Sequence, residues 1–341
     1  MTDMKTVTLD QPFQFTLSET PEPSRCEPGE ALVRVHRVGI CGTDIHAYRG
    51  RQPYFSYPRI IGHELGVEIV EVGLNERGLK AGDRCSVEPY LNCGHCIACR
   101  HGKTNCCISL QCLGVHTDGG MRELIKVPVT KLHKSDTLGL DQLALVETLG
   151  IGSHAVDRAM LGMGEYVLVI GAGPIGLSVI QFARLAEVKL IVLDVNAQRL
   201  DFARRQFGVD YIVNAQDNPL ARVMEITDGD LPTVVFDATG SGESMMGAFQ
   251  YVAHGGRLVF VGLMQGDITF SDPFFHRREM TILSSRNSLP ANFTRIIALM
   301  ESGRVNTDPW ITHRASADAL PELFPKWVSP ESGMLKGIVE F

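Results

Sequence analysis

Nine cysteines are spread unevenly along this chain, and four of them fall within one short segment. Cys93, Cys96, Cys99 and Cys107 have the spacing Cys-x2-Cys-x2-Cys-x7-Cys. Four thiolates on a short segment can complete a tetrahedral shell that excludes water, which is how proteins hold structural zinc. An odd number of cysteines clustered in this way favours metal binding over a disulfide framework. We therefore expect a structural zinc site here, with Cys106 as an alternative to Cys107 for the fourth ligand.

A second set of possible ligands is scattered along the first half of the chain. Cys41 lies in a glycine-rich segment, His63 and Glu64 follow another glycine, and Glu147 comes much later. One thiolate, one imidazole and one or two carboxylates make a mixed set that suits zinc with an open or exchangeable position. An open position is typical of a catalytic metal ion, so these residues are candidates for a catalytic zinc site.

A glycine-rich run at residues 171–176 (GAGPIG) follows an apolar strand directly and opens a helix. Gly171 permits the tight turn, Gly173 lets the backbone approach a pyrophosphate, and Gly176 lets the helix and strand pack closely. Pro174 and Ile175 complete the first turn of the helix, whose N-terminus can bind the phosphates. This context predicts a dinucleotide-binding site.

An acidic residue favours NAD over NADP at this site. Asp194 comes 18 residues after Gly176, at the end of the next predicted strand. A carboxylate there can accept hydrogen bonds from the adenosine ribose hydroxyls, and it would repel a 2'-phosphate. Arg199 could contact the ribose or a phosphate, or it could be a solvated helix residue.

The elements that must position these residues change in character near Leu149. Before it, short strand-like runs alternate with glycine and proline turns, as at 31–38, 65–72 and 84–87, which indicates a β-rich, barrel-like domain. After it, six apolar strands alternate with helices, which predicts an α/β fold with a doubly wound parallel sheet. We expect these strands at 166–170, 190–193, 211–213, 234–236, 258–261 and 281–283, and helices at 174–186 and 197–207, the second ended by Gly208.

These patterns suggest a division into three segments. Residues 1–148 would form the catalytic zinc domain, with the structural zinc lobe at 90–110, and residues 149–287 would form the dinucleotide-binding domain. Residues 288–341 would contain one more helical segment and end in a strand at 337–341 that returns to the first domain.

Composition excludes several other classes of protein. The chain has 341 residues, 44% of them hydrophobic and 21% charged, which is typical of a globular protein with two domains. A formal net charge of -7 without a basic tract argues against nucleic acid as a partner, and therefore against a nucleic-acid-binding zinc ribbon. We find no signal core or apolar segment long enough to span a membrane, so we expect a cytoplasmic protein without a membrane partner.

Over essentially its whole length the sequence resembles the zinc-containing medium-chain dehydrogenases, the superfamily of alcohol, sorbitol and threonine dehydrogenases. The resemblance rests on several motifs that occur in the same order: residues 41–46 (CGTDIH), 62–66 (GHELG), the four-cysteine lobe, Gly119-Gly120 ahead of Glu123, and 171–176. It implies a GroES-like catalytic domain, a Rossmann-type domain that binds NAD, two zinc ions per subunit and a homo-oligomer, either a dimer or a tetramer.

The resemblance also implies roles for the scattered residues. Cys41 and His63 would be catalytic zinc ligands, Glu64 a direct or exchanging ligand, and Asp44 a partner that orients a ligand. Thr43 and His46 match positions that relay the substrate proton toward solvent. Glu147 stands where classical alcohol dehydrogenases have a cysteine, as in the sorbitol and threonine branches, and could bind zinc directly or through water.

The resemblance limits the substrate only to a class. Residues 113–120 and 284–287 look most like bacterial dehydrogenases of the sugar-acid group, which implies oxidation of a secondary alcohol on a polyol or on an L-galactonate-like sugar acid. Arg286 could pair with a substrate carboxylate, bind cofactor or cap structure, and His116 is a similar candidate. The alternatives are an L-threonine 3-dehydrogenase or 2,3-butanediol dehydrogenase, a quinone-reductase-like protein without catalytic zinc, and a regulatory protein that senses NAD.

Overall fold

The protein is described by a computed structural model that covers residues 3–341. The chain divides into two compact units. Unit 1 comprises the residues up to Glu147 together with Leu289–Phe341, and unit 2 comprises Thr148–Ser288. Within the described residues, no helix combines the length and the apolar character that a membrane crossing requires.

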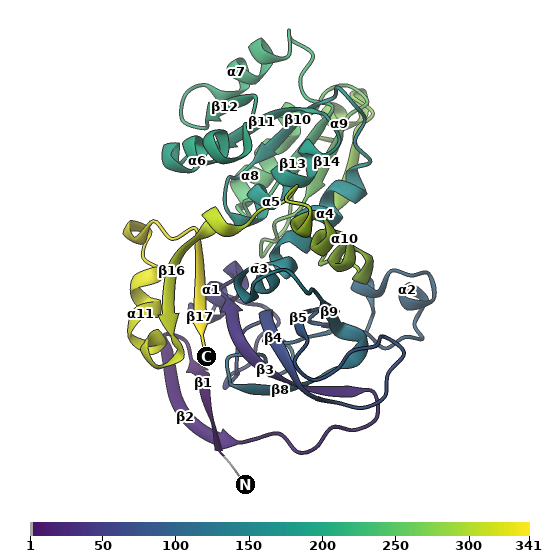
Figure 1. Ribbon diagram of the computed structural model, residues 1–341. Coiled ribbons are helices and arrows are strands. Elements are labelled where there is room, and N and C mark those ends of the chain that lie inside the picture. The colour runs from purple at the N-terminus through teal and green to yellow at the C-terminus, as the bar shows by residue number, and fades with distance from the viewer. Residues whose placement is uncertain (1–2) are drawn as a thin grey trace. The chain divides into compact units, whose positions relative to one another are not determined.

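Unit 2 is built on a six-stranded parallel sheet (Figure 1). The strands are β10 (Tyr166–Ile170), β11 (Lys189–Asp194), β12 (Tyr211–Asn214), β13 (Val234–Asp237), β14 (Arg257–Phe260) and β15 (Thr281–Ser284). Their order is β12-β11-β10-β13-β14-β15, and every neighbouring pair is parallel. This confirms the predicted α/β fold and its six strands. The order reverses between β10 and β13, which is where ligands bind at the carboxyl ends of strands in such sheets.

One helix precedes the strands of unit 2, and further helices connect them. They are α4 (Val146–Ala159), which begins in unit 1, then α5 (Pro174–Arg184), α6 (Ala197–Phe207), α7 (Pro219–Ile226), α8 (Gly242–Gly247) and α9 (Asp272–Arg277). The side chain of Asn196 caps α6 by accepting the N–H groups of Gln198 and Arg199, and Gly208 ends this helix with a φ of 55°. The predicted helix at 197–207 is confirmed, whereas α5 ends at Arg184, two residues earlier than expected.

Unit 1 contains a seven-stranded sheet and two small hairpins. The sheet consists of β3 (Glu30–Gly39), β4 (Glu64–Val72), β5 (Arg84–Val87), β8 (Leu124–Pro128), β9 (Leu132–Lys134), β16 (Ile311–Ser316) and β17 (Lys336–Glu340), and the hairpins are β1 (Asp3–Gln11) with β2 (Gln14–Pro21) and β6 (Tyr90–Leu91) with β7 (Gln111–Cys112). The order is β16-β17-β3-β4-β5-β9, and β8 pairs with β3. The C-terminal strand, predicted at 337–341, is β17, and it pairs antiparallel with β3.

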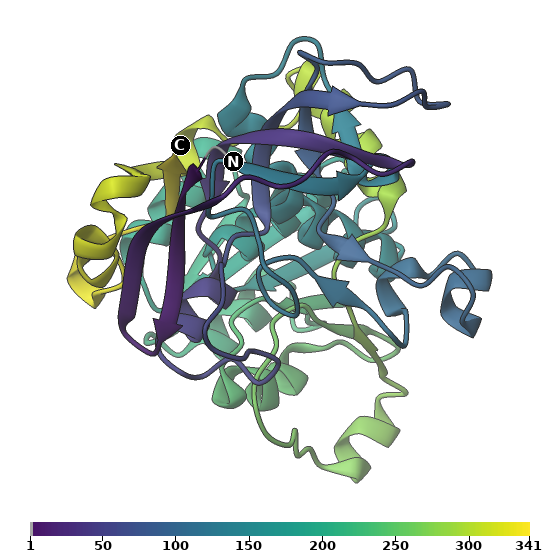
Figure 2. The same cartoon turned by 90° about the horizontal axis from the view of Figure 1, so that it is seen from below.

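Unit 1 contains several short helices and one longer helix, α10. They are α1 (Gly42–Tyr48), α2 (Ile97–Arg100), α3 (Leu140–Ala144), α10 (Pro290–Glu301) and α11 (Leu320–Trp327). The sequence predicted one helical segment after Leu289, but the structure has two, α10 and α11. Pro325 lies inside α11, and because proline removes a backbone donor it hides the helical pattern. The segment around α2 projects from the sheet (Figure 2).

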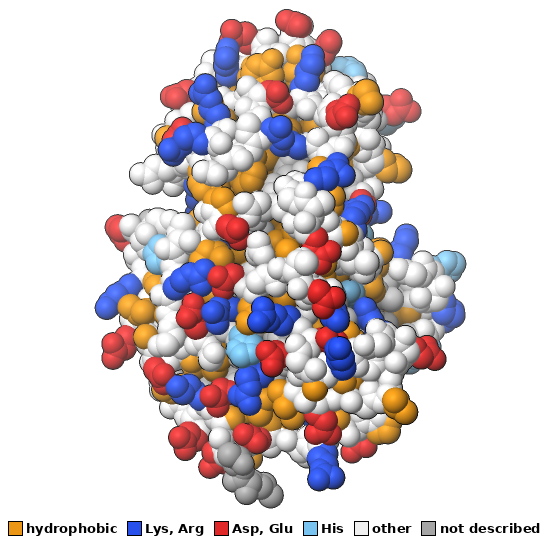
Figure 3. Space-filling model, viewed as in Figure 1, with side chains coloured by type: hydrophobic (Ala, Val, Ile, Leu, Met, Phe, Trp, Pro, Cys, Tyr) orange, Lys and Arg blue, Asp and Glu red, His pale blue; other side chains and the backbone are white. Residues whose placement is uncertain are grey.

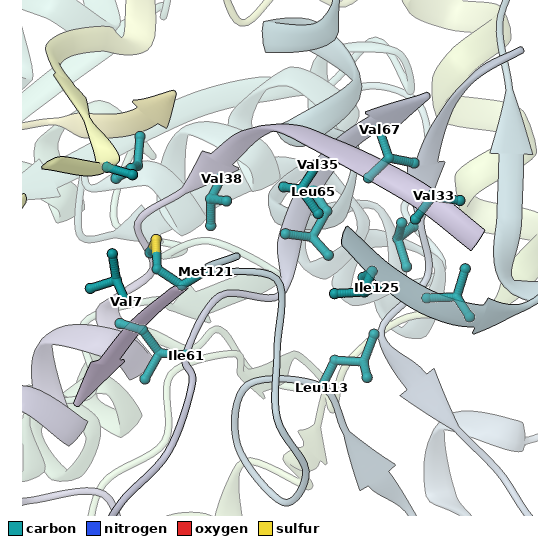
Figure 4. Close-up of a cluster of buried hydrophobic side chains, with 14 of the residues drawn as sticks. Val7, Val33, Val35, Val38, Ile61, Leu65, Val67, Leu113, Met121 and Ile125 are labelled. Atoms are coloured by element: carbon teal, nitrogen blue, oxygen red, sulfur yellow. The ribbon is translucent and has the colours of Figure 1, made fainter. Parts of the chain in front are cut away.

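A buried apolar cluster holds the strands of unit 1 together (Figure 4). Val35 of β3, Leu65 of β4 and Ile125 of β8 are at most 2% exposed. Burial of side chains of this kind stabilises by about 1.5–3 kcal/mol each. The cluster therefore fixes the neighbouring ends of β3 and β4, where the catalytic ligands were predicted. On the outer face shown in Figure 3, acidic and basic side chains are interspersed.

Candidate metal centres and dinucleotide site

The end of β3 and the start of β4 bring the first predicted ligands together. The two strands pair antiparallel, with Gly39 opposite Glu64. Cys41 follows β3 and precedes α1, and His63 directly precedes β4. One ligand atom from each of Cys41, His63 and Glu64 lies within 4.8 Å of the others. Their convergence is therefore a consequence of strand register, and the spacing matches a small ion.

Gly39 is required by the position of the Glu64 carboxylate. A Cβ at residue 39 would lie 2.0 Å from Oε2 of Glu64, a distance that no real contact shows. Any other residue would displace the carboxylate from the cluster. This explains part of the glycine-rich setting that the sequence showed around Cys41.

Asp44 lies behind His63 and is 1% exposed. Its Oδ2 accepts the Cys41 N–H at 2.9 Å, and its Oδ1 lies 3.7 Å from Nδ1 of His63. Burial raises the pKa of Asp44, and His63 partly offsets this effect. Burial alone would lower the pKa of His63, but Asp44 and then Cys41 hold it well above its ordinary value. The arrangement suits an imidazole oriented by a carboxylate toward a cation.

Two buried polar atoms of this cluster have no hydrogen-bond partner among the described residues: Oδ1 of Asp44 and Nδ1 of His63. Such atoms are rare in native interiors and commonly mark the place of an ion or water. The donor set of one thiol, one imidazole and one carboxylate is also one that zinc accepts. The residues present therefore fit a zinc ion.

Lys336, which the sequence analysis did not single out, neutralises Glu64. Its Nζ lies 2.5 Å from Oε1 and 2.5 Å from Oε2 of Glu64, and it also donates to the Ile40 carbonyl at 3.1 Å. Both side chains of this ion pair are 1% exposed. The only sequence signal was a lysine at the edge of an apolar C-terminal strand.

Glu147 is not part of the group of three ligand atoms. It lies in the first turn of α4, is 3% exposed and accepts a hydrogen bond from the hydroxyl of Tyr90. Burial raises the pKa of Glu147, partly offset by His63, so the two side chains share one environment. Burial and then Glu147 raise the pKa of Tyr90 well above its ordinary value. Tyr90 was missed because nothing in its local sequence distinguishes it.

The two residues assigned to a proton relay both lie on α1. Thr43 is half-buried and His46 is exposed, whereas Asp44 between them is buried. Burial, followed by Arg49 and Arg51, lowers the pKa of His46. The helix thus carries these side chains from the interior toward solvent.

The four-cysteine lobe is closed around its thiols. One sulfur atom each from Cys93, Cys96, Cys99 and Cys107 lies within 4.8 Å of the others. Cys107 is buried and Cys106 is exposed, which favours Cys107 over Cys106 as the fourth ligand. The backbone N–H groups of Cys99 and Ile108 lower the pKa of Cys96 to about 6, so the lobe already favours a thiolate there. This donor set fits structural zinc.

The glycine-rich turn of unit 2 lies between β10 and α5. Gly171 has a φ of 98°, and a Cβ at Gly176 would lie 1.7 Å from the Gly171 carbonyl oxygen. Gly173 caps α5, with Pro174 in its first turn and half-buried Ile175 after it. The backbone therefore requires glycine at positions 171 and 176, and the N-terminus of α5 remains available for an anion.

Asp194 and Arg199 lie beside this turn. The carboxylate of Asp194 accepts the Ala172 N–H at 2.6 Å and the Asn196 N–H at 2.7 Å. A Cβ at Gly173 would be 3.7 Å from a guanidinium nitrogen of Arg199, so this arginine reaches the turn that opens α5. One carboxylate and one guanidinium therefore flank the predicted phosphate site.

The two candidate substrate residues have different surroundings. Nδ1 of His116 accepts the Cys112 N–H at 3.1 Å, and its ring stacks on Tyr54 with centroids 6.0 Å apart. Arg286 is exposed and follows β15 in unit 2. Neither position tests a role in substrate binding.

Comparison with known proteins agrees with both halves of this description. Residues 27–137 match the family model of the alcohol dehydrogenase GroES-like domain, and residues 174–302 match that of zinc-binding dehydrogenases. The chain is 38% identical to L-galactonate-5-dehydrogenase of Escherichia coli K12, with all of both chains covered. It is 33% identical to L-threonine 3-dehydrogenase of Pyrococcus horikoshii, over 87% of this chain and 86% of the relative.

A solved structure gives the same result. The crystal structure of a short chain alcohol dehydrogenase (RspB) of E. coli CFT073, complexed with NADH, matches with a TM-score of 0.91 and 30% identity over all of both chains. The glycine motif, the ligand clusters and these matches agree, and the chain therefore belongs to the zinc-binding medium-chain dehydrogenases, the alcohol dehydrogenases with a GroES-like domain.

Proposed function

We propose that this protein is a zinc-dependent oxidoreductase that transfers a hydride from a secondary alcohol of a polyol or an L-galactonate-like sugar acid to NAD. The observation that carries the proposal is the convergence of Cys41, His63 and Glu64 within 4.8 Å, beside buried atoms that lack partners. The substrate class is supported by the 38% identical relative, which is named as an L-galactonate-5-dehydrogenase.

Cys41 and His63 would hold the catalytic ion, which when bound polarises the alcohol oxygen and lowers its pKa. Charge balance distinguishes the two glutamates. Lys336 already forms an ion pair with Glu64, whereas Glu147 accepts a hydrogen bond from the neutral hydroxyl of Tyr90 and has no ion pair of this kind among the described residues. The thiolate of Cys41 and the carboxylate of Glu147 would together balance a divalent cation, so we assign Glu64 as the exchanging ligand.

Two residues of α1 would move the substrate proton. The hydroxyl of half-buried Thr43 would accept it, and exposed His46 would release it to solvent. Burial and the nearby arginines lower the pKa of His46, which favours the neutral imidazole, the form that can accept a proton. Asp44 would keep the His63 ring in the orientation that a cation requires.

The glycine-rich turn would bind the dinucleotide. Gly171, Gly173 and Gly176 allow the close approach of a pyrophosphate, and Arg199 lies near enough to Gly173 to add a positive charge. We propose NAD because the carboxylate of Asp194 at the end of β11 would repel a 2'-phosphate.

The remaining proposals concern the second metal site and the assembly. Cys93, Cys96, Cys99 and Cys107 would bind a structural zinc ion, giving two per subunit. All nine cysteines are unpaired, which suits a reducing compartment, and we place the enzyme in the cytoplasm. The outer edge of β15 has no partner strand among the described residues and could pair with a second subunit.

The decisive experiment is NADH formation by the zinc-loaded enzyme across aldonates, polyols, threonine and 2,3-butanediol. Turnover of an aldonate such as L-galactonate without turnover of threonine would support the proposal. The alternative is L-threonine 3-dehydrogenase or 2,3-butanediol dehydrogenase activity, which the P. horikoshii relative and a 27% identical butanediol dehydrogenase structure from Bacillus subtilis favour. Turnover of threonine or butanediol alone would replace the proposed substrate class.

A further inference from the structure

A group of buried polar side chains lies beside the four-cysteine lobe, and the proposed reaction does not use them. Glu88, Lys131 and His133 are 1%, 7% and 3% exposed. Glu88 follows β5, and Lys131 directly precedes β9, which pairs with β5 (Figure 1). Burying a charge is costly unless it is paired and hydrogen-bonded, so such a group needs an explanation.

Lys131 connects this group to the lobe. Its Nζ lies 2.5 Å from Oε1 of Glu88 and 3.0 Å from Oδ1 of Asn92, the residue directly before the first cysteine. His133 completes the group on the far side, with Nε2 3.3 Å from Oε2 of Glu88. The charges of Lys131 and Glu88 cancel, and the contact with Asn92 extends beyond that pair.

The contact with Lys131 fixes the orientation of the Asn92 amide. An ammonium group can only donate, so it must face the amide oxygen. The amide nitrogen therefore points the other way, and it lies 3.7 Å from Sγ of Cys99. The opposite orientation would set N–H groups against an ammonium and an oxygen against a thiolate, which are both repulsive.

A four-thiolate site has a particular need for such a donor. Four thiolates around a divalent cation leave two negative charges in excess, and hydrogen bonds to the sulfur atoms offset this charge. The backbone N–H of Cys93 donates to Sγ of Cys107 at 3.3 Å, whereas Sγ of Cys99 accepts from the side-chain amide of Asn92. The ammonium of Lys131 polarises this donor because it is bonded to the other end of the same amide.

We propose that Asn92 is a positioning residue of the structural metal site, whose amide, polarised by Lys131, donates to the Cys99 thiolate and slows release of the metal. The inference rests on the proposed role of the four cysteines as a zinc site. It gives the buried pair of Lys131 and Glu88 a function: Glu88 holds the ammonium group of Lys131 in place, and that group faces the Asn92 amide oxygen.

The substitution Asn92→Asp tests the proposal with little change in shape. Aspartate keeps an oxygen for Lys131 but replaces the N–H donor with an oxygen that faces the thiolate. Loss of a partner of this kind typically weakens metal binding about 10-fold to 100-fold. If Asn92 served only as a partner for Lys131, aspartate would leave metal binding unchanged.

Full-length protein loaded with cadmium-113 provides a readout for each site. The cadmium resonance shifts with the number of sulfur ligands, so a four-thiolate site and the mixed site give separate signals. We expect EDTA to remove the four-thiolate signal at least about 10-fold faster in Asn92→Asp than in the wild type, with the mixed-site signal unchanged. Asn75→Asp is the matched control, because the Asn75 amide donates to the backbone carbonyls of Gly73 and Leu79 and, among the described residues, to no sulfur atom.

A second variant covers the case in which Asn92→Asp does not fold. The double substitution Lys131→Met with Glu88→Gln removes the polarising charge without leaving a buried unpaired charge, and it should also accelerate loss of the four-thiolate signal. Equal release rates in the wild type and in the folded variants would overturn the role of Asn92. Absence of a four-thiolate signal from the wild type would instead refute the proposed structural site.

Discussion

Replacing Lys336 with methionine should show how the negative charge of the buried Glu64 carboxylate is neutralised. Lys336 and Glu64 are each 1% exposed, and Nζ lies 2.5 Å from both carboxylate oxygens. Among the described residues, Oε2 of Glu64 has no hydrogen-bond partner besides this contact. Removing one member of a buried ion pair leaves an uncompensated charge and costs about 3–5 kcal/mol. Methionine keeps most of the volume, so we expect a loss of this size in the free energy of unfolding of metal-free unit 1.

The zinc-loaded protein should lose less stability than the metal-free protein. Glu64 lies in the ligand cluster with Cys41 and His63, so a bound cation can take over the role of the ammonium group. By thermodynamic linkage, Lys336→Met should therefore bind the catalytic zinc more tightly than the wild type, although it is less stable without metal. A purely structural ion pair gives equal losses in both states.

Urea unfolding followed by tryptophan fluorescence measures this difference. Both tryptophans of the chain, Trp310 and Trp327, are buried in unit 1, so the signal reports on the unit that contains the ion pair. Wild type, Lys336→Met and the double variant Lys336→Met with Glu64→Gln should each be unfolded with and without a chelator. The double variant should regain most of the lost stability because no charge is left unpaired. Equal losses with and without zinc would refute the reasoning.

Four further predictions concern the catalytic zinc site, the dinucleotide site and the buried polar group beside the four-cysteine lobe. Cys41→Ser should reduce the zinc content from two ions per chain to about one and abolish turnover, measured by metal analysis and NADH formation; full activity would contradict the assignment. Asp194→Ala should weaken the preference for NAD over NADP in kcat/KM, and an unchanged ratio would exclude the proposed role. Tyr90→Phe removes the hydroxyl that donates to Glu147, so it should change the absorption spectrum of the cobalt-substituted enzyme, and an identical spectrum would separate Glu147 from the metal. Burial lowers the pKa of His133 despite the opposing effect of Glu88. The contribution of His133 to stability is therefore complete above about pH 6.5 and declines as pH falls through the folded-state pKa, by up to about 1.4 kcal/mol per pH unit. His133→Phe should remove this slope when urea unfolding is measured at several pH values, and a retained slope would assign it to other groups.

The parts of the fold that were predicted correctly depend on local patterns. Strands buried on both faces appear as continuous apolar runs, so all six strands of unit 2 could be located from the sequence. The end of α6 at Gly208 and the glycine-rich turn were also predicted, because each is determined by residues close together in the chain. Helix α11 was missed because Pro325 lies inside it.

The same distinction applies to the two metal sites. The four-cysteine cluster could be predicted from spacing alone, because all its ligands lie on one short segment. Cys41, His63 and Glu64 converge only because β3 and β4 pair with Gly39 opposite Glu64. Family resemblance identified these residues, but it did not identify Lys336, the side chain that forms an ion pair with Glu64.

By itself, therefore, the sequence determined the features that neighbouring residues specify: the parallel sheet, the glycine-rich turn and the four-cysteine lobe. Only the tertiary structure decided which buried charged side chains lie together and which groups they contact. Lys336 and Glu64 are 272 positions apart and meet because β17 pairs with β3. Lys131 and Asn92 are 39 positions apart and meet because β9 pairs with β5. Local patterns do not encode such contacts, because the strand pairing that creates them is stabilised by the whole core.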